Sequence, residues 1–202
     1  MQSKNLLLIF TRNPELGKCK TRLAATVGNE TALEIYKFLL QYTVSITKNI
    51  PAVKQVYYSE EIWEKDIWNT TIFEKKLQNG ANLGDRMANA FELGFKNGFE
   101  KILVIGSDMY DLDATTIENA FSELDKSDFV IGPAQDGGYY LLGMKKFNAN
   151  VFKNKAWGTH TVLNDTLKNL EKYKTKLLDV RNDVDVYEDI KDISAFNSFL
   201  KK

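Results

Sequence analysis

The sequence predicts an α/β fold in three layers, in which a mostly parallel sheet lies between two layers of helices. Short apolar runs that suit strands buried on both faces recur along the 202 residues. Segments with apolar residues at spacings of three and four, which suit amphipathic helices, alternate with these runs. Neither an internal repeat nor a linker rich in proline, glycine or serine divides the chain. We therefore expect a single domain over residues 1–202.

The strands are predicted from apolar runs that are bounded by polar residues or turn formers. Their shortness and continuity favour strands that helices cover on both sides. In chain order the runs are residues 6–10, 53–58, 101–106, 129–131 and 139–142, and a further apolar segment follows at 177–180.

The helices are predicted from apolar stripes at helical spacing. In chain order the stripes are residues 32–46, 83–99, 114–124, 162–170 and 190–200. The first is expected to end near Pro51, because the residue before a proline disfavours helix. Asp113 directly precedes the third stripe and is expected to be its N-cap. We expect a short helix around Trp63 and Trp68 that buries both rings in ordinary packing.

Composition and charge exclude several classes of function. Lysine plus arginine and aspartate plus glutamate each number 27, so no overall field attracts nucleic acid or an anionic membrane. Cys19 is the single cysteine and there is one histidine, which excludes an internal disulfide and a structural zinc site. The N-terminal apolar run is too short for an export signal or a membrane span. We expect a cytoplasmic protein in which any anion site is local.

The segment 132–143 reads GPAQDGGYYLLG and is the strongest single indication of a site. Gly137 and Gly138 lack a Cβ, so a ligand can lie directly against the chain beside Asp136. Tyr139 begins an apolar run that would hold this acidic turn rigidly. The alternative is an ordinary Asp-Gly turn with a solvated carboxylate.

The loop after the first predicted strand reads TRNPELGKCKTRL and is rich in cations. Arg12, Lys18, Lys20 and Arg22 lie close together in a segment that Gly17 interrupts. Backbone amides and cations in such a loop suit a nucleotide diphosphate. The Walker pattern of a glycine, four residues and Gly-Lys-Ser/Thr is absent. The alternative is a basic loop that faces only water.

Carboxylates follow two predicted strands and suit a divalent metal ion. Asp108 directly follows the run at 101–106, and its oxygens suit Mg²⁺ or Mn²⁺ bridging two phosphates. Asp111 follows it as a weaker candidate. Asp183 and Asp185 are two residues apart, and in an extended segment that spacing directs both carboxylates to one side. The alternative for this pair is an acidic loop that caps the last helix.

Two further loops carry groups that suit recognition of small molecules. Residues 78–84 are rich in amides and glycines, and Asn82 and Gly84 are candidates for contact with a base or ribose. The alternative is a plain turn that caps the next helix. Trp157 and Thr159 precede the stripe at 162–170 and are expected to border an acceptor pocket. His160 lies beside them but is a weak candidate for a base.

In their order and spacing these segments resemble a GT-A-like family of bacterial transferases, known as selenodomain-associated or arsenosugar-type glycosyltransferases. The fold of that family resembles nucleotide-diphosphosugar transferases and, more distantly, molybdenum cofactor and phospholactate guanylyltransferases. The resemblance runs over nearly the whole chain. The segments that carry it are FTRNPELGKCKTRL, NLGDRM, IGSDMYDL, GPAQDGGYYLLG, residues 157–163 and DVRNDVDVYEDI.

The resemblance implies roles for individual residues. Lys20 and Arg22 would contact phosphates, Asp108 would help to hold a divalent metal, and Asp136 with its two glycines would line the sugar or acceptor side. One departure stands out, because the family usually has Cys-Pro after the Ser-Asp pair, where this chain has Met109 and Tyr110. Loss of the proline predicts a looser turn behind Asp108.

We therefore expect a metal-dependent transferase that moves a glycosyl group from a nucleotide-diphosphosugar to a small-molecule acceptor. The metal and the basic loop would stabilise the departing diphosphate, and Asp136 would orient or deprotonate the acceptor. A nucleotidyltransferase that releases pyrophosphate and a nucleotide-binding protein without catalysis are the alternatives. The donor base, the sugar, the acceptor and the oligomeric state cannot be derived from the sequence.

Overall fold

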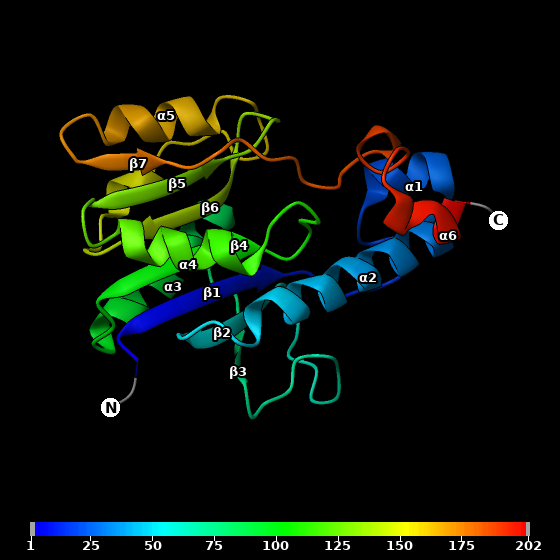
Figure 1. Cartoon of the computed structure of the whole chain (residues 1–202), viewed down its shortest axis with the longest axis horizontal. Coiled ribbons are helices and arrows are strands. Elements are labelled where there is room, and N and C mark those ends of the chain that lie inside the picture. The colour runs from blue at the N-terminus through cyan, green and yellow to red at the C-terminus, as the bar shows by residue number, and fades with distance from the viewer. Residues whose placement is uncertain (1–2, 201–202) are drawn as a thin grey trace.

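The computed structural model describes residues 3–200 and contains a seven-stranded sheet in the order β3-β2-β1-β4-β6-β5-β7 (Figure 1). The bounds of its strands are β1 Asn5–Thr11, β2 Val53–Tyr58, β3 Phe73–Leu77, β4 Lys101–Gly106, β5 Phe129–Pro133, β6 Tyr139–Met144 and β7 Thr175–Leu177. The α-helices are α1 Thr21–Val27, α2 Asn29–Thr47, α3 Leu83–Lys96, α4 Ala114–Glu123, α5 Val162–Asn169 and α6 Asn197–Leu200.

All neighbouring strands pair in parallel except β6, which runs antiparallel to both β4 and β5. The carboxyl ends of β1, β4 and β5 therefore lie at the same edge of the sheet as the amino end of β6. In open α/β sheets, ligands bind at this edge. Three of the loops that the sequence selected as sites, those after β1, after β4 and between β5 and β6, lie at these strand ends, so the topology brings them to one side of the molecule.

Two hydrophobic clusters, one on each face, make the three layers that the sequence predicts. Leu7 and Ile9 of β1 pack on the face that α2 and α4 cover, and Leu6 and Leu8 pack on the face that α3 covers. Because successive side chains of a strand point to opposite faces, burial of both faces requires the continuous apolar run. All four side chains are fully buried.

A third cluster lies beyond the sheet, where α1, the start of α2 and α6 lie together at the right of Figure 1. Leu23, Ile35 and Phe196 form its centre. It joins α1, which directly follows the basic loop, to the segment near the C-terminus that contains Phe196. The cluster therefore anchors both α1 and this C-terminal segment.

Two predictions about helices are wrong. Residues 190–200 do not form one helix: they contain the 3₁₀ helix η3 (Ser194–Phe196) and α6, after the 3₁₀ helix η2 (Tyr187–Asp189). The Asp189 carboxylate accepts hydrogen bonds from the backbone N–H groups of residues 185 and 186, which caps a short turn here. The segment around Trp63 and Trp68 is a series of bends, although Trp68 is buried as expected.

Two elements were not predicted because their sequences lack a visible period. The strand β3 reads FEKKL and has only Phe73 buried, since it is an edge strand with charged side chains at its surface. The helix α1 buries only Leu23. The expected apolar segment at 177–180 also differs from the observed strand, since β7 comprises Thr175–Leu177. Asp113 is the N-cap of α4 as predicted, accepting a hydrogen bond from the Thr116 N–H at 2.7 Å.

Within residues 3–200, no helix combines the length and the apolar character that crossing a bilayer requires.

A buried ion pair holds the irregular loop between β2 and β3. Lys75 Nζ lies 2.8 Å from Asp66 Oδ1, and the two side chains are only 7% and 11% exposed. Lys75 also donates to the Trp63 carbonyl at 2.6 Å, and the Tyr58 hydroxyl donates to Asp66. These contacts tie the loop that follows β2 to β3, the strand that contains Lys75.

Asp66→Ala is expected to destabilise the fold by about 3 kcal/mol, because removing one partner of a buried pair leaves the other charge uncompensated. Urea denaturation measures this free energy of unfolding. Glu64→Ala removes an exposed carboxylate from the same loop and is the matched control, with an expected change within about 0.5 kcal/mol. Equal stability of the two variants would contradict a structural role for the pair.

Candidate active site

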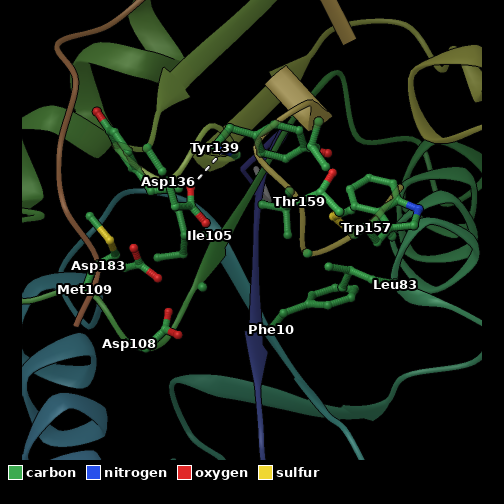
Figure 2. Close-up of a pocket in the computed structure, with 18 residues that line it drawn as sticks. Phe10, Leu83, Ile105, Asp108, Met109, Asp136, Tyr139, Trp157, Thr159 and Asp183 are labelled. Carbon is green, nitrogen blue, oxygen red and sulfur yellow. Dashed lines mark hydrogen bonds between the residues drawn. The ribbon is translucent and has the colours of Figure 1, made fainter. Parts of the chain in front are cut away.

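Two adjoining cavities open at the edge of the sheet where the selected loops meet. The larger, of about 620 Å³, is the basic cavity, and the smaller, of about 240 Å³, is here named the second cavity (Figure 2). They share four lining residues, which are Phe10, Leu83, Gly106 and Asp108. A ligand that filled both would therefore pass Asp108 at the end of β4.

The basic cavity carries five cations against three acids. The cations are Arg12, Lys18, Lys20, Arg22 and Arg86, and the acids are Glu60, Asp108 and Asp185. Four of the five cations come from the loop after β1 and the start of α1, as the sequence predicted. Arg86 of α3 was not predicted. An excess of donors with positive charge in a cavity of this size suits a phosphorylated ligand.

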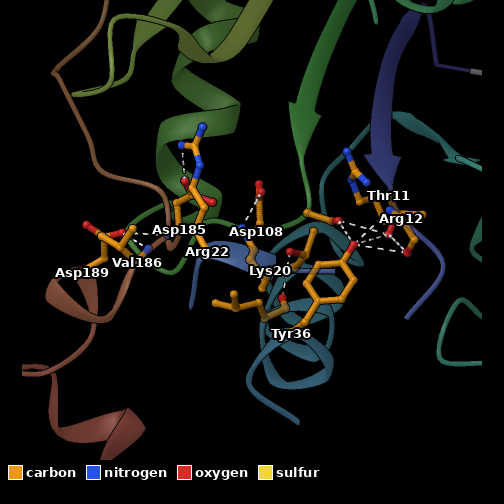
Figure 3. A network of polar contacts seen from close by, with 12 residues as sticks. Thr11, Arg12, Lys20, Arg22, Tyr36, Asp108, Asp185, Val186 and Asp189 are labelled. Carbon is orange, nitrogen blue, oxygen red and sulfur yellow. Dashed lines mark hydrogen bonds and ion pairs between the residues drawn. The ribbon is translucent and has the colours of Figure 1, made fainter. Parts of the chain in front are cut away.

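The ion pair between Lys20 and Asp108 joins the loops that follow β1 and β4. Lys20 Nζ lies 2.9 Å from Asp108 Oδ2, and the Lys20 side chain is only 7% exposed (Figure 3). Burial is the largest single influence on Lys20 and would lower its pKa, but the charge and hydrogen bond of Asp108, together with the charges of Asp183 and Asp185, outweigh burial and raise this pKa. Burial would likewise raise the pKa of Asp108, but the charge and hydrogen bond of Lys20, together with a backbone hydrogen bond and the charge of Arg12, outweigh burial and lower that pKa. Both groups are therefore charged.

Asp183 faces Asp108 and Asp136 along one side of the second cavity, opposite Phe10 and Leu83 (Figure 2). Burial, and then the charge of Asp108, raise the pKa of Asp183 from its ordinary value of 3.8 to about 6. The Val184 N–H donates to the Asp108 carbonyl at 3.2 Å, which holds the C-terminal segment against the loop after β4. This contact brings the acids together.

Asp185 does not share the position of Asp183. It lines the basic cavity, where its Oδ2 lies 2.8 Å from Arg22 Nη1 (Figure 3). Within residues 3–200 no three side chains of His, Cys, Asp or Glu form a group that could hold a metal ion. The structure thus brings Asp108 near Asp183 but does not bring the three predicted metal ligands together.

The turn between β5 and β6 is both an Asp-Gly turn and a wall of the second cavity. Asp136 Oδ1 accepts a hydrogen bond from the Gly138 N–H at 2.8 Å. Gly137 has a φ of +88°, and a Cβ there would collide with the backbone of His160. Asp136, Gly138 and Tyr139 line the cavity, whereas Gly137 does not. Gly137 therefore serves the close approach of another chain segment.

The other predicted residues also divide into those that line a cavity and those that serve packing or a turn. Trp157 and Thr159 line the second cavity, and Asn82 lines the basic cavity. Gly84 lines neither, and a Cβ there would lie 2.5 Å from Trp157 Nε1, so its absence lets the indole pack against α3. Gly17 also lines neither cavity; its φ of +73° serves the turn of the basic loop.

Sequence reasoning missed a buried hydroxyl network at the ends of β1 and β4. Tyr36 is 3% exposed, and its hydroxyl accepts from the Arg12 N–H at 2.9 Å (Figure 3). The same hydroxyl lies 3.2 Å from Ser107 Oγ and 3.3 Å from Thr11 Oγ1. Tyr36 fitted the apolar stripe of its helix, so the pattern held no sign of this polar role.

Arg181 was also missed, and it fixes the C-terminal segment over the site. Its guanidinium lies 2.9 Å from Asp111 Oδ1 and 3.3 Å from Asp113 Oδ2, and it donates to Thr116 Oγ1 at 2.9 Å. Its carbonyl accepts from the Gln135 N–H of the β5–β6 loop at 3.0 Å, and its N–H donates to the carbonyl of Pro133 at the end of β5 at 3.1 Å. We name residues 178–186 the C-terminal strap.

The departure at Met109 and Tyr110 does not leave the turn behind Asp108 loose. The Tyr110 ring packs 4.8 Å from Tyr42 and 5.1 Å from Phe196, measured between ring centroids. Met109 is 2% exposed and lines the second cavity. Aromatic packing supports the turn where the expected proline is absent.

The likeness to solved structures covers nearly the whole chain. A protein from Desulfovibrio desulfuricans G20, provisionally named a nucleotide-diphospho-sugar transferase, shares 29% identity with a TM-score of 0.87 over 98% of this chain and 94% of that chain. The 4-diphosphocytidyl-2C-methyl-D-erythritol synthase from Anaerococcus prevotii DSM 20548 shares 9% identity, with a TM-score of 0.60 over 98% and 97%. The inositol-1-phosphate CTP transferase from T. maritima shares 13%, with a TM-score of 0.53 over 98% and 96%.

No curated protein matches the chain. A family model described as "Uncharacterized protein conserved in bacteria (DUF2064)" matches residues 43–159, which is more than half of the chain. The matched part holds β2 to β6 and the turn with Asp136. The chain belongs to this bacterial DUF2064 family, and it has the fold of nucleotide-diphospho-sugar transferases.

Proposed function

We propose that the protein is a transferase that uses a nucleotide-activated donor, and that it moves a glycosyl group from a nucleotide-diphosphosugar to a small-molecule acceptor. The observation that carries the proposal is the meeting of a basic cavity and an acid-lined cavity at Asp108. The fold supports it, since the similar structures include a provisionally named nucleotide-diphospho-sugar transferase and cytidylyl transferases. Because one fold supports many functions, the residues of the site decide between them.

The basic cavity would hold the nucleotide diphosphate. Lys20 lies at its border with the second cavity, where the bond between diphosphate and sugar would break. Fixed positive charge at that position stabilises the departing diphosphate more than the bound donor, which lowers the barrier to transfer. Arg12 and Arg22 would bind the phosphates further from the bond, with Asn82 available for the ribose or base.

Asp108 and Asp183 fit a divalent cation of the Mg²⁺ or Mn²⁺ type. Two hard carboxylates lie on one side of the second cavity, and each raises the cost of charging the other. Such an ion would supply charge to neutralise a diphosphate at that point. Asp185 lies with Arg22 and is a weaker third ligand.

Asp136 would act on the acceptor. Its Oδ1 is held by the Gly138 N–H, and Asp136 lines the second cavity, whereas the cations of the basic loop line the basic cavity. A carboxylate fixed in this way orients an acceptor hydroxyl and takes its proton as the bond to the sugar forms. Trp157 and Thr159 border the same space.

Charge favours glycosyl over nucleotidyl transfer. A nucleotidyltransferase that releases pyrophosphate commonly takes a phosphate as its second substrate, yet no Lys, Arg or His among residues 3–200 lines the second cavity. The alternative keeps one observation in its favour, because five cations in the basic cavity would also suit a triphosphate.

Nucleoside diphosphates and their sugar conjugates are expected to raise the melting temperature by about 3 °C or more at saturation, because they bind the native state alone. A thermal-shift screen over the common bases, with and without Mg²⁺ or Mn²⁺, measures this and identifies the base. The bound conjugate should then release a nucleoside diphosphate with an acceptor. Release of pyrophosphate from a triphosphate and a sugar phosphate would instead establish nucleotidyl transfer, and no shift by any nucleotide would contradict both.

Asp136→Asn is expected to lower turnover about 100-fold or more while leaving nucleotide affinity and melting temperature unchanged. The amide oxygen keeps the hydrogen bond from Gly138 but cannot take a proton. Turnover and calorimetric affinity are measured side by side. Asp179→Asn is the matched control, since this exposed carboxylate lines neither cavity. Wild-type turnover of Asp136→Asn would remove the residue from the mechanism.

Asp183→Asn is expected to raise the melting temperature above pH 7 in buffer with a chelator. The raised pKa means that the folded state binds this proton more tightly than the unfolded state, so the contribution of Asp183 to the stability of the wild type falls as pH rises from about 4 through 6. The difference between the proteins should shrink below pH 4, where both side chains are neutral. Mg²⁺ or Mn²⁺ should stabilise the wild type more than the variant. Equal stabilisation of both by the metals would exclude Asp183 as a ligand.

A further inference from the structure

The charged residues that line the second cavity are all acids. They are Asp108, Asp136 and Asp183, and no cation among residues 3–200 accompanies them in the lining. Asp108 is neutralised from the other cavity by Lys20 at 2.9 Å. The ion pairs of residues 3–200 include neither Asp136 nor Asp183, so neither carboxylate is held by a side-chain cation.

The opposite wall of the second cavity is apolar. Phe10 and Leu83 lie across from the acids, and the Trp157 ring lies beside them (Figure 2). Tyr139 completes the wall with its ring edge-on to Trp157, at 6.4 Å between centroids. The Tyr139 hydroxyl is buried and has no hydrogen-bond partner within residues 3–200.

The size of the second cavity suits one ring with substituents. A cavity of about 150 Å³ holds a benzene molecule, and this one measures about 240 Å³. The shared residues Phe10, Leu83, Gly106 and Asp108 connect it to the basic cavity. A group attached to a diphosphate in the basic cavity would therefore enter the second cavity past Asp108.

We propose that the second cavity holds an uncharged sugar of the donor and excludes sugars that carry a carboxylate or a phosphate. This inference rests on the proposed function. Hydroxyl groups donate hydrogen bonds to Asp136 and Asp183, and the C–H face of the sugar ring packs on the apolar wall. An anionic sugar places a like charge against these acids in a partly desolvated space, and no Lys, Arg or His side chain among residues 3–200 lines the cavity to compensate it.

The test compares three probes that share the base identified by thermal shift: the nucleoside diphosphate, its glucose conjugate and its glucuronic acid conjugate. The two conjugates differ only at C6. Isothermal titration calorimetry, with and without Mg²⁺, should give an affinity for the glucuronic acid conjugate about tenfold or more below that of the glucose conjugate, a difference of about 1.4 kcal/mol. The readout is binding and does not depend on an acceptor.

Leu83→Arg tests the cause, because it places a cation at the wall shared by the two cavities. Leu83 is 44% exposed at the start of α3, so an arginine fits there without repacking the core. The variant should bind the two conjugates within about threefold of each other. Leu93→Arg is the matched control: Leu93 is also 44% exposed on α3, lines neither cavity, and should leave the discrimination unchanged.

The outcomes separate this inference from the proposed function. Equal affinity for the two conjugates in a protein that binds the nucleoside diphosphate would overturn the inference alone. Unchanged discrimination in Leu83→Arg would overturn the electrostatic explanation and with it the inference. Failure of every nucleotide to bind would overturn the proposed function, on which the inference rests.

Discussion

The ion pair between Lys20 and Asp108 is the contact on which the rest of the site depends. It joins residues 88 positions apart, ties the basic loop to the end of β4 and stands at the border of the two cavities. A buried lysine without a partner would lose its charge or unfold its surroundings. In the proposed function a diphosphate would replace Asp108 as the partner of Lys20, and a divalent ion would replace Lys20 as the partner of Asp108. Binding would therefore exchange partners and bury no new uncompensated charge.

The topology of the sheet explains why such distant segments meet. Because β6 runs antiparallel, the β5–β6 turn with Asp136 opens at the same edge as the loops after β1 and β4. The C-terminal strap then crosses this edge, where Arg181 and the Val184 N–H fasten it to the loop after β4. Asp183 therefore reaches Asp108 through backbone contacts, which leaves its carboxylate available to a ligand.

The sequence predicts features that one physical rule imposes on many residues, such as a buried strand. It does not predict contacts that depend on two particular residues, such as those of Arg181. Burial of both faces requires a continuous apolar run in β1 and β4, so these strands could be predicted, and the rule for strand ends makes Lys20, Asp108 and Asp136 candidates for the site. The partners of Arg181 lie 65 to 70 positions away and follow no period. Glycines show a related limit, because a missing Cβ admits a ligand or a neighbouring chain equally well, and Gly84 and Gly137 admit Trp157 and the His160 backbone.

The turn behind Asp108 is supported by aromatic packing at the position where the resemblance predicts a proline. Proline would fix this turn through its own ring, whereas here Tyr110 fixes it through contacts with Phe38, Tyr42 and Phe196. Phe38 and Tyr42 belong to α2, and Phe38 and Phe196 take part in the third hydrophobic cluster. That cluster also contains Val184 of the strap, so the same packing supports the turn behind Asp108 and anchors the strap that bears Asp183. The turn behind Asp108 and the strap that bears Asp183 are thus held by one cluster, which a proline in the turn would not provide.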